Sequence, residues 1–114
     1  MKFRNDEHKA MFNEFYGRMK KQDAYHEALA YLLALNNDVV QERTEEVYFD
    51  FDEDRIKKDA LEDGECGSTR RIITLAFHLW NDSNEANITD VFGYISDKAE
   101  YLFEAIRIRF RVRK

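Results

Sequence analysis

The chain has 114 residues, of which 44% are hydrophobic and 36% charged, and its formal net charge is −5. This mix is typical of one folded domain, residues 1–114, and argues against disorder. The longest apolar runs fall short of the 18 or so residues of a transmembrane helix, and the single cysteine, Cys66, excludes an internal disulfide. Acidic residues stand near the N-terminus where a signal peptide would be apolar, so we expect a cytoplasmic protein.

The charge is distributed unevenly along the chain. Residues 42–65 hold eleven acids and four bases, whereas residues 104–114 hold one acid and five bases. Such asymmetry can mark an interaction surface, and it can equally be an internal match between two segments that pair. The bases of the C-terminal segment are Arg107, Arg109, Arg111, Arg113 and Lys114.

The first half of the chain predicts three helices. Asn5 is a good N-cap for a helix over residues 5–21, in which apolar side chains recur at helical spacing. Asp23 can cap a second helix, which has a broad apolar face and ends at Asn36. We expect a third helix over residues 38–47, with its first residue, an aspartate, as the cap.

The periodicity changes after the third helix. Residues 47–52 alternate between apolar and polar side chains, which predicts a strand, and residues 52–54 have the composition of an acidic turn. Ile56 should then return the chain to the core, and residues 58–63 can form one short helical segment.

The clearest helix of the second half spans residues 69–80, with Ser68 as its cap. Its apolar side chains occupy so much of the circumference that we expect this helix at the centre of the fold. Two further helices should be capped by Thr89 and Asp97.

The C-terminal segment is ambiguous between helix and strand. Residues 106–113 alternate between apolar and basic side chains, which favours a strand. The sequence therefore predicts a single, mainly α domain of five to six helices. A short two-stranded antiparallel element, about residues 47–52 with 106–112, would place basic side chains opposite acidic ones.

Three segments resemble a known family. They are Phe3 with Glu7-His8 and Phe12, the helix from Gly67-Ser68 to Ala76-Phe77-His78-Leu79-Trp80-Asn81, and the ending Glu104-Ala105-Ile106-Arg107-Ile108-Arg109-Phe110. In these the chain is similar to a family of uncharacterised small proteins, a domain of unknown function, from Gram-positive bacteria and their phages and integrative elements. The resemblance implies a mobile-element context in a bacterial cytoplasm and carries no known catalytic residue.

Several groups could carry chemistry, and each has a structural alternative. Cys66 precedes a helix N-terminus, where a thiolate is favoured, but it can also be an ordinary loop cysteine. Residues 67–69 could bind an anion or simply cap the helix. The histidines His8, His26 and His78 lack partners at ligand-like spacing, so we expect neither a metal site nor a cofactor.

The acidic segment is the main candidate for a binding surface. A dense carboxylate array can imitate nucleic-acid phosphates toward a basic groove, and the alternative is a solvated face partly neutralised by the arginine-rich C-terminus. We expect steering by the acids and docking of an exposed aromatic side chain. The candidate partner-binding residues are Glu42, Glu45, Glu46, Tyr48, Asp50, Asp52, Glu53, Asp54, Glu62 and Asp63.

Three functions remain open from the sequence. The leading hypothesis is a non-enzymatic mobile-element inhibitor of a host defence protein, such as an anti-CRISPR protein that blocks the nucleic-acid groove of a type II CRISPR nuclease. This is a similarity of type, since several anti-CRISPR proteins are small, acidic and helical. The second is a nucleic-acid-binding regulator that uses the basic C-terminus, which the negative net charge opposes. The third is a small enzyme with Cys66 as nucleophile. No membrane partner is expected.

Overall fold

A computed structural model describes residues 1–62, 67–81, 85–93 and 97–111. Residues 63–66, 82–84, 94–96 and 112–114, which include Asp63 and Cys66, lie outside the described part. The elements in chain order are α1 (Asp6–Arg18), α2 (Ala24–Leu35), α3 (Asn37–Glu42), α4 (Glu45–Tyr48), β1 (Phe49–Asp50), β2 (Arg55–Ile56), the 3-10 helix η1 (Lys58–Glu62), α5 (Gly67–Trp80), α6 (Ile88–Phe92) and α7 (Ala99–Arg109). The mainly α fold with a short antiparallel element is therefore confirmed.

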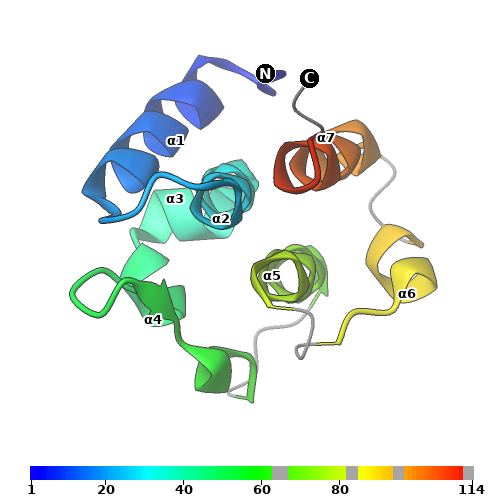
Figure 1. Ribbon diagram of the computed structural model, residues 1–114. Helices are drawn as coiled ribbons and strands as arrows, with labels where there is room; N and C mark the ends of the chain where they lie inside the picture. The colour runs from blue at the N-terminus through cyan, green and yellow to red at the C-terminus, as the bar shows by residue number, and fades with distance from the viewer. Residues whose placement is uncertain (63–66, 82–84, 94–96, 112–114) are drawn as a thin grey trace.

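Helix α2 lies at the centre, with α1, α5 and α7 on three sides of it (Figure 1). Nine of its twelve residues are buried, because alanine and leucine cover its whole circumference. The expectation that residues 69–80 form the central helix is wrong: α5 packs against α2 on one side and against α6, α7 and η1 on others, and it keeps an exposed polar edge. Within the described residues, no helix is both long enough and apolar enough to cross a membrane.

The two N-terminal caps form as the sequence predicts. Asn5 Oδ1 accepts a hydrogen bond from the backbone N–H of His8 (2.8 Å), and Asp23 Oδ1 accepts one from that of His26 (2.9 Å). Each side chain satisfies a helix-terminal N–H that has no partner within the helix. The caps therefore fix the starts of α1 and α2.

The segment predicted as one helix over residues 38–47 is two helices. Asn36, rather than Asp38, caps α3, and the residue after its last turn, Arg43, has the left-handed conformation (φ 54°). Helix α4 then starts at Glu45. Because the predicted third helix is two helices, the described residues form seven α-helices where five to six were predicted. A left-handed residue turns the chain, and this turn brings Tyr48 into the core.

Three further helix starts differ from the prediction by one or two residues. Helix α5 begins at Gly67 (φ 68°), so that Ser68 lies in its first turn. Asn87, rather than Thr89, caps α6, and the residue before α7 is Lys98 rather than Asp97. Asparagine caps a helix at least as well as threonine, so the sequence alone does not separate the candidates.

The antiparallel element pairs two neighbouring segments. Phe49 pairs with Ile56 and Asp50 with Arg55, whereas residues 106–109 belong to α7, so the predicted pairing of 47–52 with 106–112 is wrong. A pairing across a four-residue turn closes a much shorter loop and costs less entropy than one across about 50 residues. The alternating C-terminal pattern also fits a helix, because Leu102, Ala105 and Ile108 repeat every third residue and are buried.

Candidate functional site

The acidic turn, defined here as residues Asp50–Asp54, connects β1 to β2 and is held at its first residue by its own backbone. Asp50 Oδ1 accepts hydrogen bonds from the backbone N–H groups of Asp52 (2.9 Å) and Glu53 (3.0 Å). These bonds, the one from Glu53 above all, lower the pKa of the Asp50 carboxyl. Asp50 therefore acts as the internal clamp of the turn.

The other end of the acidic turn is fixed by Asp54, which has left-handed backbone (φ 58°). Its carboxylate accepts hydrogen bonds from the backbone N–H groups of Lys20 (2.9 Å) and Lys21 (3.2 Å), in the connection from α1 to α2. It also contacts His26 Nε2 at 2.8 Å. The acidic turn is thus attached to the first two helices.

His26 bridges two carboxylates. Its Nδ1 lies 2.7 Å from Asp23 Oδ1 and its Nε2 lies 2.8 Å from Asp54 Oδ2. The pKa of Asp23 is lowered, because hydrogen bonds from the backbone and ring of His26 outweigh the opposing effect of burial. The ring packs against Trp80, 4.5 Å between centroids.

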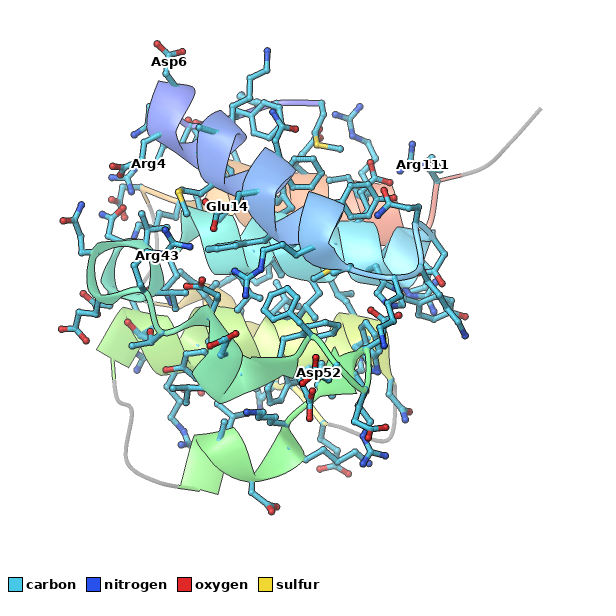
Figure 2. All side chains as sticks on the ribbon, turned by 90° about the vertical axis from the view of Figure 1, so that its left-hand side faces the viewer. Arg4, Asp6, Glu14, Arg43, Asp52 and Arg111 are labelled. Atoms are coloured by element: carbon cyan, nitrogen blue, oxygen red, sulfur yellow. The ribbon has the colours of Figure 1, made fainter. Side chains whose placement is uncertain are left out.

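Glu45, on the first turn of α4, is almost fully buried (4% exposed) between two arginines. Its carboxylate accepts hydrogen bonds from Arg18 Nη1 (2.8 Å) and Arg43 Nη2 (2.9 Å). Burial alone would raise its pKa, but the bonds from Arg43 and Arg18 outweigh this and lower it. Glu14 joins the same network through Arg43, and the two side chains point toward one another between α1 and α3 (Figure 2).

The predicted partner-binding residues therefore divide into internal and external groups. Tyr48 is 1% exposed, so the expectation of an exposed aromatic for docking is wrong at this position: α4 turns its ring into the core. Glu45, Asp50 and Asp54 bind within the fold, as described above. Among the predicted partner-binding residues, the carboxylates of Glu42, Glu46, Asp52 and Glu53 are exposed, while the side chain of Glu62 and the whole of Asp63 lie outside the described part.

The C-terminal arginines do not pair with the acidic segment in the described residues. Arg107 Nε donates to Glu104 (2.8 Å), Arg109 Nε donates to the carbonyl of Leu79 (2.7 Å), and Arg111 pairs with Glu27. Figure 2 shows Arg111 well apart from Asp52. The predicted neutralisation of the acidic segment by this end of the chain is therefore not seen, and Arg18 and Arg43 take that role.

A second candidate site, which sequence reasoning missed, lies at the C-terminal end of α5. Trp80 lines three adjoining hollows, and the one with no described carboxylate has a volume of about 440 Å³. That volume lies within the usual range of ligand pockets. We call this hollow the Arg109 cleft; it is lined by Tyr25, His78, Leu79, Trp80, Asn81, Arg109 and Phe110.

In sequence these lining residues fall in three separate places: position 25, residues 78–81 and residues 109–110. The one available signal was an arginine next to a phenylalanine beyond the last predicted helix. No group of three or more histidine, cysteine, aspartate or glutamate side chains that could hold a metal ion occurs in the described ranges.

A family of unknown function, DUF6075, matches residues 1–113. The chain belongs to this family. No curated protein and no solved structure matches it.

The segments that carry the family resemblance meet in the fold. The N-terminal segment contacts α7, because the backbone N–H of Lys2 donates to Glu104 (2.8 Å). The end of α5 contacts the end of α7 through the bond from Arg109 to Leu79. His8 also lies in this region, where its Nε2 contacts the carbonyl of Tyr31 (3.0 Å), and burial lowers the pKa of its imidazole. The three resembling segments therefore meet at α7, which contacts both the N-terminal segment and the end of α5.

A prediction on pH dependence follows from Glu45. The pKa of the Glu45 carboxyl is lower in the folded protein than in the unfolded chain. Its ionised form therefore stabilises the fold at any pH above the pKa of the unfolded chain, and this stabilisation is lost as the pH falls through the pKa of the folded protein. We expect the free energy of unfolding, measured in urea, to fall below about pH 5. Glu45→Gln should be less stable at pH 7 and lose less on acidification. Glu42→Gln, at an exposed position, should keep the wild-type profile. Identical profiles for Glu45→Gln and wild type would contradict this role.

A second prediction concerns His26. His26→Leu leaves Asp54 without its ring partner, and we expect a loss of about 2–4 kcal/mol in unfolding free energy, together with faster amide exchange in residues 50–54. Asp54→Asn and the double variant complete a double-mutant cycle. The contact predicts that the two losses are strongly non-additive. Additive losses would show that the imidazole does not fix the acidic turn.

Proposed function

We propose that the protein is a mobile-element protein that binds and inhibits a host defence protein through the exposed carboxylates around the acidic turn. The partner would carry a basic groove that normally holds nucleic acid, as in a type II CRISPR effector nuclease, and binding would take place in the bacterial cytoplasm. The family gives no activity, so the proposal depends on the chemistry of the surface.

The observation that carries the proposal is the rigid attachment of the acidic turn. Asp50 and Asp54 use their carboxylates inside the fold, and the ring of Phe51 lies 3.9 Å from the guanidinium of Arg18. Between them, Asp52 and Glu53 are exposed at a tip that is held on both sides. A preorganised tip loses less conformational entropy on binding than a flexible one.

Charge supports a basic partner over other kinds. Asp52 and Glu53 give the tip its negative charge, and Glu46, on the helix directly before β1, is also exposed and pairs with Arg18 (3.2 Å). Complementary charge increases the rate of association and fixes the orientation of the complex. The acids here are too few to imitate the phosphates along a full duplex, which carries about one charge per 1.7 Å. We therefore propose that the acidic tip blocks only a short part of the partner's nucleic-acid groove.

The proposal predicts that the purified protein binds a type II CRISPR effector nuclease and inhibits its DNA cleavage. The double variant Asp52→Lys/Glu53→Lys should lose at least about tenfold in affinity, mostly through slower association at low salt. The matched control is Glu85→Lys/Asp97→Lys, which makes the same charge change at two exposed positions away from the acidic turn.

Equal losses in the two double variants would reduce the effect to net charge and contradict a specific role for the acidic turn. If the wild-type protein neither binds the nuclease nor slows cleavage, the CRISPR version of the proposal is wrong. Affinity purification from host lysate would then have to recover another protein with a basic nucleic-acid groove, and recovery of none would overturn the proposal as a whole.

A further inference from the structure

We propose that the Arg109 cleft binds a nucleoside phosphate, with the phosphate on Arg109 and the base against the aromatic side chains. The site is separate from the acidic turn, and the inference does not depend on the proposed function.

Arg109 is held in a fixed position by its surroundings. Its Nε donates to the carbonyl of Leu79 (2.7 Å), and its guanidinium carbon lies 3.7 Å from the ring centroid of Tyr25 and 4.7 Å from that of Phe110. The terminal nitrogens donate to no other described residue. Aromatic contacts on a guanidinium leave its in-plane N–H groups available, and these match two oxygens of a phosphate.

The aromatic side chains supply surfaces for a planar ring. Tyr25 is 42% exposed and Phe110 is 59% exposed, while the half-buried Trp80 is backed by His26 and Phe49. Bases that are not stacked in a helix bind in proteins by stacking on such side chains, and each contact is worth about 1–3 kcal/mol. A volume of about 440 Å³ suits one nucleotide.

Electrostatics favours one nucleotide over a long strand. The lining holds the cation of Arg109 and no described carboxylate, so it is locally suited to an anion. The chain as a whole carries −5, and this charge opposes the approach of a polyanion. A single phosphate on a free nucleotide meets the local charge without this repulsion, and the end of a short strand meets it with less repulsion than a long strand.

The alternative occupant is a peptide that ends in an aromatic residue and a free carboxylate. It would meet the same arginine and rings. The hydrogen-bond fork of Arg109 accepts either anion, but the stacking surfaces favour a flat, extended π-system over a single phenyl ring. We therefore assign the nucleotide, and the peptide is a competitor in the test.

The test uses Trp80, the single tryptophan of the chain, whose indole N–H gives one side-chain resonance in a nitrogen–proton correlation spectrum. Adenosine monophosphate should shift this resonance in a saturable way. Adenosine should bind at least about tenfold more weakly, because it lacks the phosphate. A short single-stranded oligoadenylate with a terminal phosphate distinguishes a free nucleotide from a strand end as the natural source, and binding of either supports the proposal.

Variants connect the shift to Arg109. Arg109→Gln should weaken adenosine monophosphate binding by at least about tenfold while leaving adenosine binding nearly unchanged, a difference that a purely structural role would not produce. Arg109→Lys keeps the charge but loses the planar fork, and it should recover only part of the affinity. Lys9→Gln, at an exposed position on α1, removes one positive charge elsewhere and should bind like wild type.

Two results would overturn the assignment. The first is an indole resonance that does not respond to either nucleotide ligand. The second is tighter binding of a short peptide ending in phenylalanine with a free carboxylate than of adenosine monophosphate, which would make the cleft a peptide site. Unfolding curves of each variant exclude loss of the fold as the cause of lost binding.

Discussion

Helix α2 is apolar around its whole circumference, and this constraint organises the rest of the chain. A helix of that kind is stable in water only when other elements enclose it on all sides. Helices α1, α5 and α7 supply three of these sides, and α3 follows directly after it. The ends of the chain are drawn together because α1 and α7 cover neighbouring parts of the same helix, and the contact between Lys2 and Glu104 follows from this arrangement.

The few polar groups of α2 connect it to irregular segments. His26 near its start holds the acidic turn through Asp54, and the hydroxyl of Tyr31 donates to the carbonyl of Lys2 (2.5 Å) at the N-terminal segment. Asn36 at its end caps α3, and Thr69 Oγ1 of α5 contacts its Oδ1 (3.4 Å). Buried polar groups are costly unless they are paired, so each one fixes the segment that satisfies it. The position of the acidic turn is thus set by the central helix.

Sequence reasoning found the features that are decided locally. Three kinds of feature depend only on residues a few positions away, and all are present. They are the caps Asn5 and Asp23, the turn at residues 52–54, and the burial of Ile56. Tyr48 was misplaced because its environment depends on the left-handed Arg43, and nothing in the sequence marks a non-glycine residue for that conformation. The Arg109 cleft was missed because its walls come from α2, α5 and α7, and only the tertiary fold brings them together.

The uneven charge along the sequence has a different meaning in the folded molecule. The block at 42–65 looks like a continuous acidic surface, but Glu45, Asp50 and Asp54 are used inside the fold, and Arg18 and Arg43 are drawn among them. What remains outside is a small acidic tip on a rigid base. The described C-terminal arginines likewise bind other parts of the fold, and Arg109 alone among them lines a cleft with aromatic walls. The contact between Trp80 and His26 lies between these two sites, so one packed cluster supports an acidic tip and a cationic cleft. Opposite charges on one small domain are stable here because each is anchored by its own partners and the two need not pair with one another.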